Sequence, residues 1–125
     1  MQEAVKRNRK IVLVADDDFD LLQLVKMQLQ QAGFLVQLSL NGNGIVKMAQ
    51  EDHPDIILLD ITMDGISGGD ICKKLKSDDQ TSSIPVIMIS ANDNIEDVAQ
   101  HCGANDFVRK PFNVQSIRET INRYV

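Results

Sequence analysis

The sequence has few aromatic residues, no tryptophan and no long apolar run, and each absence argues against a class of function. Four Phe and one Tyr among 125 residues make the stacking surfaces that bind single-stranded nucleic acids improbable. No apolar stretch approaches the roughly 20 residues of a membrane-spanning helix, and the N-terminus lacks the apolar core of a signal peptide. We therefore expect a cytoplasmic protein whose partners are neither nucleic acids nor membranes.

Positive charge is also scarce. The 13 Lys and Arg residues are outnumbered by 18 Asp and Glu, and the net charge of −5 argues against a surface that binds a phosphate backbone. We interpret residues 1–9 as a solvated N-terminal leader and residues 10–125 as one folded domain, which is long enough to bury a hydrophobic core. A small basic cluster occupies the first ten residues: Lys6, Arg7, Arg9 and Lys10.

Cysteine and histidine do not form a metal-binding pattern. Cys72 and Cys102 have no Cys-x-x-Cys spacing, and His53 and His101 share no metal-ligand spacing. Each cysteine falls on the apolar face of a predicted helix, so we expect both to be buried, reduced thiols. We place both histidines on the surface or in loops.

Five short apolar segments predict the strands of the fold. They are rich in Val, Ile and Leu, and the uninterrupted apolar segment before Asp60 is typical of a strand buried on both faces of a parallel sheet. After each segment, apolar residues repeat at helical spacing. The predicted strands are 10–15, 34–40, 55–60, 84–90 and 106–109, and the predicted helices are 19–32, 45–52, 70–75, 95–102 and 114–124.

The alternation of strands and helices predicts an α/β fold. We expect a doubly wound, flavodoxin-like (βα)5 domain with a five-stranded parallel sheet and helices on both faces. A closed (βα)8 barrel does not fit, because it needs about 250 residues. Two segments lack predicted regular structure: an irregular loop at 61–69 and a polar, solvent-exposed connector at 76–83 without a role in catalysis.

Polar side chains occur where the predicted strands end, and they indicate a site. Asp16 and Asp17 follow the first strand, Asp60 ends the third, Ser90 ends the fourth and Lys110 follows the fifth. Ligands of open parallel sheets bind outside this edge. Three carboxylates need a compensating cation, and an all-oxygen site suits Mg²⁺. A hydroxyl and an ammonium facing that ion typically hold a phosphoryl group, so the pattern indicates phosphoryl transfer onto a carboxylate nucleophile.

The motifs resemble those of the receiver domain of two-component response regulators, from about residue 10 to residue 124. They occur in the family's order, each at the end of the expected strand. The resemblance implies the strand order 2-1-3-4-5 of the chemotaxis regulators, and a role in phosphorelay signal transduction in place of enzymatic turnover. The matching residues are Asp16-Asp17, Asp60, Ser90-Ala91 and Lys110-Pro111-Phe112.

The resemblance implies that Asp60 is the phosphoacceptor. It would become a 4-aspartylphosphate on transfer from a sensor histidine kinase or a phosphotransfer protein. Asp17, Asp60 and the backbone carbonyl of Thr62 would bind Mg²⁺ or Mn²⁺ directly, and Asp16 would bind the ion through a water molecule. Lys110 would pair with the phosphoryl oxygens.

The resemblance also implies a conformational switch. Ser90 would hydrogen-bond the phosphoryl group and move inward, and Phe107 would change rotamer with it. The Lys110–Pro111 peptide bond would be cis. The movement would alter the surface of the fourth helix, the fifth strand and the fifth helix. A downstream effector protein, a fused output domain or a second phosphorylated copy of the chain would recognise that surface.

Several positions depart from the common receiver pattern. Asp64 stands where many receivers have Pro, Ser90 replaces the more frequent Thr, and Phe107 lacks the hydroxyl of the more usual Tyr. Thr62 and Asn92 flank the reactive carboxylate and would help to set the lifetime of the phosphorylated state. The residues expected to modulate the reaction are Asp64, Ala91, Asn92 and Pro111.

Three other functions fit parts of the pattern. A haloacid-dehalogenase-like phosphatase has its Asp nucleophile after the first strand and its acidic pair late in the chain, whereas here the acidic pair comes first. A flavodoxin has a phosphate loop rich in Ser, Thr and Gly after its first strand, where the Asp16–Asp18 run would repel phosphate. A degenerate receiver would act only as an interaction module, but every site residue of the family is present. A phosphorylation-switched signalling domain is therefore our leading hypothesis.

Overall fold

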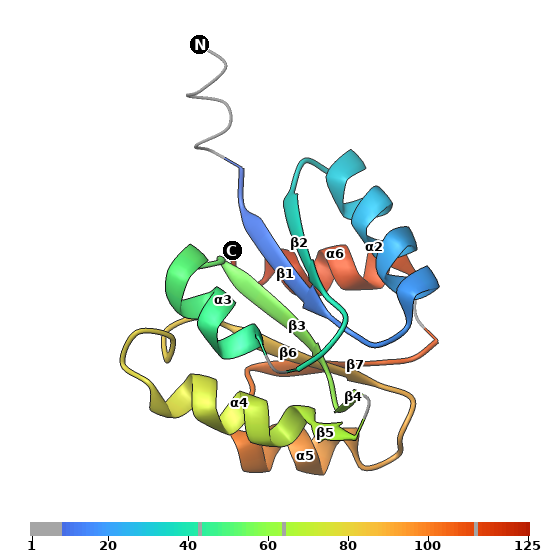
Figure 1. The fold of residues 1–125 in the computed structure, drawn as a ribbon. Coiled ribbons are helices and arrows are strands. Elements are labelled where there is room, and N and C mark those ends of the chain that lie inside the picture. Colours follow the sequence, from blue (N-terminus) through green and yellow to red (C-terminus); the bar gives the residue numbers. More distant parts are fainter. Residues whose placement is uncertain (1–8, 43, 64, 112) are drawn as a thin grey trace.

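A five-stranded parallel sheet forms the centre of the computed structural model, which describes residues 9–42, 44–63, 65–111 and 113–125 (Figure 1). The strand order is β2-β1-β3-β6-β7, which is the order 2-1-3-4-5 when only the strands of this sheet are counted. The predicted doubly wound fold is therefore confirmed. The strands are β1 (Ile11–Ala15), β2 (Leu35–Ser39), β3 (Ile56–Asp60), β6 (Val86–Ser90) and β7 (Asp106–Arg109), and the helices are α2 (Phe19–Gln31), α3 (Ile45–Asp52), α4 (Gly68–Ser77), α5 (Ile95–Cys102) and α6 (Val114–Asn122).

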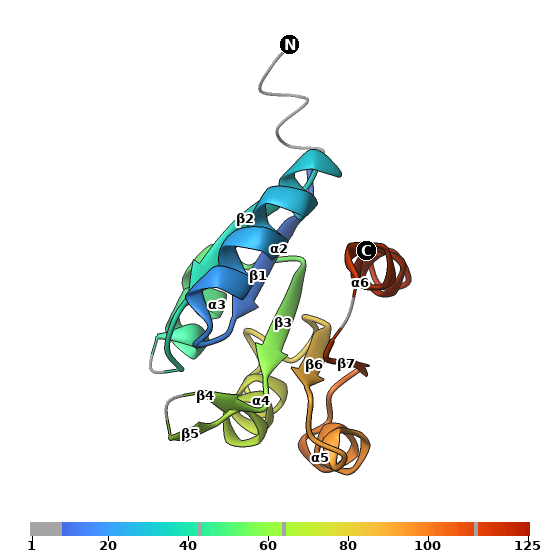
Figure 2. The ribbon, with the colours of Figure 1, turned by 90° about the vertical axis from the view of Figure 1, so that its right-hand side faces the viewer.

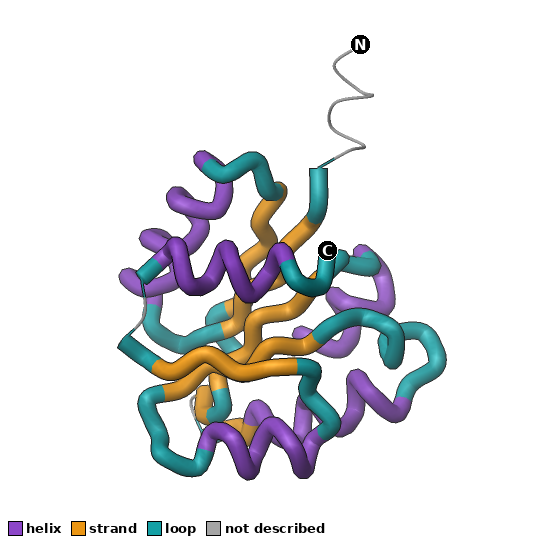
Figure 3. The backbone as a smooth tube through the Cα atoms, turned by 180° about the vertical axis from the view of Figure 1, so that it is seen from behind, coloured by secondary structure: helices purple, strands orange, loops and turns teal. Residues whose placement is uncertain are grey.

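The apolar character of the strands matches their depth in the sheet. All residues of β3 and β6 are buried, whereas every residue of the edge strand β2 is partly exposed. Figure 3 shows the strands running through the middle of the molecule with helices around them. Strands covered on both faces require apolar side chains on both faces, which explains the uninterrupted Ile and Leu residues before Asp60.

The sheet divides the hydrophobic core into two layers. Successive strand residues point to opposite faces, so Leu13 belongs to a cluster with residues of α3, α4 and α5, whereas its neighbour Val14 belongs to a cluster with residues of α2 and α6. We call these the α4 layer and the α2 layer. The two groups of helices lie on opposite sides of the sheet in Figure 1. Buried residues of the α4 layer include Leu13, Ala15, Ile57, Leu59, Cys72, Met88 and Cys102, and those of the α2 layer include Val12, Val14, Leu22, Ile56, Leu58 and Ile117.

Most helices begin where the sequence predicts, but α4 runs from Gly68 to Ser77 in place of the predicted 70–75. The side chain of Asn113 accepts a hydrogen bond from the backbone N–H of Ser116 at 2.8 Å and caps the start of α6. Gly103 follows α5 with a φ of 81°, a conformation that glycine adopts without strain. None of the helices in the described ranges is both long enough and apolar enough to span a membrane.

The segment predicted as an irregular loop at 61–69 contains a small hairpin. β4 (Thr62–Met63) pairs antiparallel with β5 (Ile66–Ser67), and α4 then begins at Gly68. The hairpin lies beside α4 below the end of β3 in Figure 2. Met63 is fully buried in the α4 layer. The prediction of irregular structure was therefore wrong. A strand of two residues is too short to show the alternation of apolar and polar residues by which strands are predicted from sequence.

The connector at 76–83 is not uniformly exposed, which corrects a second prediction. Thr81 is fully buried, and its hydroxyl donates a hydrogen bond to the carbonyl of Leu75 in α4 at 2.6 Å. The ammonium of Lys76 donates to the carbonyl of Ile84 at 2.8 Å. Lys76, in the last turn of α4, and Thr81, in the connector, therefore satisfy backbone carbonyls of Ile84, just before β6, and of Leu75.

Replacing Thr81 should show the value of this buried hydroxyl. Thr81→Val keeps the size of the side chain but removes the donor to Leu75, so we expect the free energy of unfolding in urea to fall by about 1–3 kcal/mol. Ser83→Ala, at an exposed position of the same connector, is the control and should change that free energy by less than about 0.5 kcal/mol. Equal effects of both substitutions would contradict the structural role of Thr81.

Candidate functional site

The register of β1 and β3 brings two carboxylates together. Ala15 pairs with Leu59, so Asp16 and Asp60, the next residue of each segment, emerge side by side at the carboxyl end of the sheet. Asp16 is fully buried and Asp60 is 7% exposed. The predicted juxtaposition of these two residues is confirmed.

Lys110 supplies the positive charge of this cluster. Its Nζ lies 2.7 Å from Oδ2 of Asp16 and 3.6 Å from Oδ2 of Asp60. The other oxygen of Asp16, Oδ1, accepts a hydrogen bond from the backbone N–H of Asp18 at 3.0 Å. Asp16 is thus held from two sides, and its contact with Lys110 joins residues 94 positions apart in the chain.

The electrostatic balance at Asp60 is unfavourable to its ionised form. Burial is the largest cause that raises the pKa of Asp60 from 3.8 to about 6, and the charge of Asp16 raises it further. Lys110 and the backbone N–H of Thr62 act in the opposite direction. Burial also lowers the pKa of Lys110, but Asp16 and Asp60 outweigh burial and leave this pKa above its ordinary value. The ammonium of Lys110 therefore stays protonated at neutral pH.

The acidic residues of the site could hold a metal ion. Carboxylate oxygens of Asp16, Asp17 and Asp60 all lie within 4.8 Å of one another. Asp17 is exposed while the other two are buried, so the cluster has one side open to solvent. A donor set of oxygens alone fits a hard divalent cation such as Mg²⁺. A cation there would also relieve the repulsion that raises the pKa of Asp60.

Ser90 lies at the same edge of the sheet, at the end of β6. Its side chain is almost completely buried, and its Oγ accepts a hydrogen bond from the backbone N–H of Asn92 at 3.0 Å. The backbone carbonyl of Ser90 accepts a hydrogen bond from the N–H of Lys110 at 2.9 Å, which joins the two site segments directly. Ala91 and Asn92 themselves are exposed at the rim.

The remaining candidate residues lie around this centre. Thr62 is exposed at the start of β4. Phe107 is half-buried in β7, where it packs against the α4 layer and has the guanidinium of Arg109 5.5 Å from its ring centroid. The Lys110–Pro111 peptide bond is cis, as expected. Two candidates, Asp64 and Phe112, lie outside the described residues, and their roles stay predictions.

Sequence reasoning missed Gly68, whose backbone contacts the end of β3. The N–H of Gly68 donates to the carbonyl of Ile61. A Cβ at Gly68 would overlap the carbonyl oxygen of Asp60 and would lie 2.9 Å from the Cα of Ile61. The absence of a side chain therefore lets α4 start against the backbone of the candidate phosphoacceptor. The glycine content of the 65–69 segment was visible, but it indicated only a loop.

The chain matches the model of the response regulator receiver domain family over residues 12–122. Among curated proteins, it is 35% identical over 108 residues to the DNA-binding dual master transcriptional regulator RpaA of Synechocystis. The matched segment covers 85% of this chain and 45% of RpaA. It is 33% identical over 115 residues to Protein PilH of Pseudomonas aeruginosa, covering 90% of this chain and 94% of that protein. The chain thus spans less than half of RpaA and only 23% of the response regulator PleD of Caulobacter vibrioides.

Solved structures show the same fold. The chemotaxis response regulator CheY4 of Vibrio cholerae superimposes with a TM-score of 0.87 at 27% identity, covering 94% of this chain and all of that one. The receiver domain of the Francisella response regulator 1452 gives a TM-score of 0.83 at 27% identity, covering 93% of this chain and 96% of that one. These matches extend the similarity from sequence motifs to the whole sheet and its helices.

The raised pKa of Asp60 predicts a pH-dependent effect of Asp60→Asn on stability. The folded state favours the protonated carboxyl, so the contribution of Asp60 is most favourable below pH 4 and is lost as the pH rises through about 6. In buffer without divalent cations, Asp60→Asn should therefore raise the free energy of unfolding at pH 8 by about 1–3 kcal/mol, and this gain should nearly vanish at pH 4. Urea denaturation at both pH values measures it.

The control for that experiment is Asp79→Asn, at an exposed position of the connector after α4. It removes the same charge from the surface and should change stability by less than about 0.5 kcal/mol at either pH. A lower stability of Asp60→Asn than of wild type at pH 8 would contradict the charge balance described above.

Gly68→Ala should disturb the site by way of the backbone. The added methyl group meets the backbone of Asp60, so either the end of β3 or the start of α4 must move, and we expect a loss of about 2 kcal/mol in the free energy of unfolding. Gly69→Ala is the matched control in the same helix, because its methyl group would approach only a side-chain atom of Val98, at 3.3 Å, and the side chain of Ser67. If Gly69→Ala destabilised the domain as much as Gly68→Ala, helix start effects would explain both.

Proposed function

The chain belongs to the response regulator receiver domain family, and from this premise we propose that it carries its signal as a phosphoryl group on Asp60. The observation that supports this most directly is the position of Asp60: a buried carboxylate at the end of a central strand, next to Asp16 and 3.6 Å from Lys110. With a pKa of about 6, Asp60 is largely ionised at neutral pH, as a nucleophile must be.

We propose that the donor is the phosphohistidine of a sensor histidine kinase or of a phosphotransfer protein. An oxygen of Asp60 attacks the phosphorus atom, the new oxygen–phosphorus bond forms, and the phosphorus–nitrogen bond to the imidazole breaks. The ammonium of Lys110 then has phosphoryl oxygens as partners, in addition to Asp16. The hydroxyl of Ser90 is placed at the same edge and can donate its hydrogen to a phosphoryl oxygen after a rotation.

We also propose that the reaction requires Mg²⁺, which Mn²⁺ can replace. Asp17, Asp60 and the backbone carbonyl of Thr62 would hold the ion, with Asp16 bound through a water molecule. When bound, the ion supplies positive charge that offsets the carboxylates and the incoming phosphoryl oxygens. The support for this assignment is the donor set itself, with the carboxylate oxygens of the three aspartates within 4.8 Å of one another.

The output, in this proposal, is a change of surface and not the release of a product. Ser90 moves toward the phosphoryl group, Phe107 changes rotamer, and the face built by α5, β7 and α6 changes with them. The packing of Phe107 against the α4 layer supports a link between that ring and the interior. We infer that Ala91, Asn92 and Pro111 modulate the lifetime of the phosphorylated state from the rim of the site, and that Asp64 modulates it as well.

The partners follow from the same proposal. The altered face would be read by a downstream effector protein, by a fused output domain or by a second phosphorylated copy of the chain, in the cytoplasm. Relatives such as RpaA and PleD are longer than this chain, which is consistent with output domains in that group, whereas PilH has nearly the same extent. We expect no direct contact of this domain with nucleic acids, in line with its net charge of −5.

Phosphorylation by a small donor tests the proposal. Acetyl phosphate with Mg²⁺ should add the mass of one phosphoryl group to the intact chain, and Asp60→Asn should abolish the addition while Asp79→Asn leaves it unchanged. Removing the divalent cation with EDTA should slow the labelling at least about tenfold, because the carboxylate charges are then uncompensated. Intact-mass spectrometry over time measures all four samples.

Two outcomes would oppose the proposal. Unchanged labelling of Asp60→Asn would show that another residue accepts the phosphoryl group. Sustained release of phosphate from simple phosphoesters, with many turnovers per chain, would favour a phosphatase over a phosphorylation-switched domain.

A further inference from the structure

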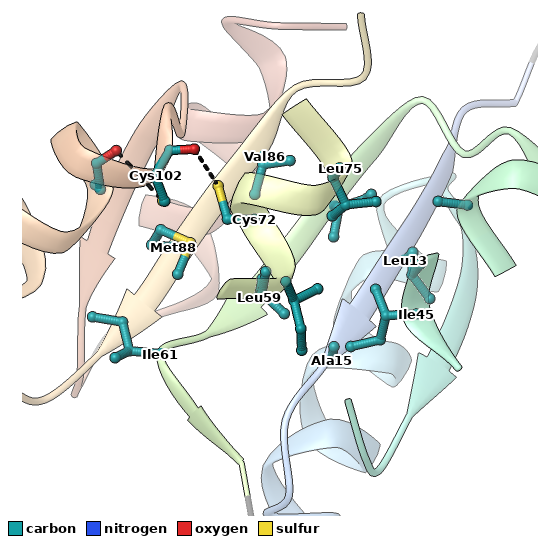
Figure 4. Packing of buried hydrophobic residues seen from close by; sticks show 14 of the residues in the cluster. Leu13, Ala15, Ile45, Leu59, Ile61, Cys72, Leu75, Val86, Met88 and Cys102 are labelled. Carbon is teal, nitrogen blue, oxygen red and sulfur yellow. Dashed lines mark hydrogen bonds between the residues drawn. The ribbon is translucent and has the colours of Figure 1, made fainter. Parts of the chain in front are cut away.

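Two cysteines of the α4 layer lie in direct contact. The thiol of Cys72, in the middle of α4, donates a hydrogen bond to the backbone carbonyl of Cys102 at 3.3 Å, and the thiol of Cys102 donates to the carbonyl of Ala99 at 3.5 Å (Figure 4). Both residues are buried and both thiols are free. The helices that carry them, α4 and α5, lie side by side in Figures 1 and 2.

The two thiols differ in reactivity because of this contact. Hydrogen bonding from Cys72 is the largest cause that lowers the pKa of Cys102 to about 7, and Lys73 contributes in the same direction. Hydrogen bonding to Cys102, burial and the charge on Cys102 raise the pKa of Cys72 far above its ordinary value. Cys102 is therefore the more acidic of the two thiols and the first to ionise as the pH rises.

A groove at the surface has Cys102, the more acidic of the two cysteines, among its lining residues. It has a volume of about 360 Å³, lies between α4 and α5, and is lined by Gly69, Lys73, Val98, His101 and Cys102, among others. Cys102 is only 3% exposed, so a large reagent would not reach it. A thiol this deeply buried requires an oxidant as small as hydrogen peroxide.

We propose that Cys72 and Cys102 form a reversible intramolecular disulfide when the protein meets hydrogen peroxide. The Cys102 thiolate attacks the peroxide, so that a sulfur–oxygen bond forms, the oxygen–oxygen bond breaks and the leaving hydroxide takes a proton to become water. The Cys72 sulfur then attacks the sulfenic acid of Cys102. The sulfur–sulfur bond forms, and the hydroxyl group leaves as a second water with the proton of Cys72. The two thiols together lose two electrons, and these electrons reduce one molecule of hydrogen peroxide.

The order of the two steps follows from the charges. While Cys102 is a thiolate, its negative charge opposes ionisation of Cys72. Once Cys102 has become a neutral sulfenic acid, that opposition is removed and Cys72 can act as the resolving thiol. Cys102 is the last residue of α5, and Gly103 follows it in the left-handed conformation. The sulfur that must move is therefore at a helix end and not within a helix.

The disulfide would tie together the two helices that leave the proposed phosphorylation site. α4 begins at Gly68, against the backbone of Asp60, and α5 follows the loop after Ser90. The cross-link is a separate property from phosphoryl transfer, and its formation does not depend on Asp60.

Peroxide treatment of the reduced full chain at pH 7.5 tests the proposal. The expected product is a monomer lighter by two hydrogen atoms, in which one proteolytic fragment links Cys72 to Cys102, and dithiothreitol should restore the original mass. Cys72→Ser should stop at a sulfenic acid on Cys102, which adds the mass of one oxygen atom to the intact chain. Cys102→Ser should leave Cys72 at least about tenfold less reactive, because Cys72 is fully buried and does not line the groove.

Several results would overturn the proposal: no loss of hydrogen from the monomer, a disulfide only between two copies, or equal peroxide reactivity in the two variants. Should Cys72→Ser fail to fold, Cys72→Ala provides the same single thiol without a new polar group in the core. Fragment mapping of the wild-type chain decides the question without any variant. The Asp60→Asn variant should form the disulfide at the wild-type rate, so a failed phosphorylation assay and a failed disulfide assay can be told apart.

Discussion

Repulsion between two buried carboxylates is the interaction on which the site depends. Asp16 and Asp60 follow a pair of adjacent residues in β1 and β3, so the sheet itself forces them together. Little water is left around them to screen the charges. Lys110 offsets part of the repulsion, and any cation or phosphoryl group that enters must rebalance the same three side chains.

The surroundings of Asp60 leave little free space around its backbone. The carbonyl of Asp60 lies against the start of α4, where Gly68 leaves no room for a side chain. On the other side, the carbonyl of Ser90 binds the N–H of Lys110, which joins the ends of β6 and β7. A displacement of a few tenths of an ångström at Asp60 therefore meets close-packed backbone in two directions. Interiors this dense move as units, which favours two discrete arrangements over gradual deformation.

Much of this molecule could be predicted from its sequence, because the decisive signals are local. Apolar runs predict the strands of the sheet, and the polar residues that follow those runs predict the cluster of Asp16, Asp60 and Lys110. Contacts between distant segments could not be predicted in the same way. The buried hydroxyl of Thr81 and the close approach of Gly68 depend on tertiary packing, which neither composition nor periodicity encodes. The roles of Phe107 and of the metal ligands require a second state of the molecule, so they stay predictions.

The division of the core into two layers has a consequence for how such a domain can evolve. Side chains of the α4 layer pack on one face of the sheet and those of the α2 layer on the other. A substitution in one layer leaves the packing of the opposite layer intact, because the strands lie between them. Selection for a new partner at α3 or α4 can therefore proceed while an older partner at α2 keeps its surface. Duplicated copies of the chain could diverge on one face at a time, with the charged edge of the sheet unchanged in all of them.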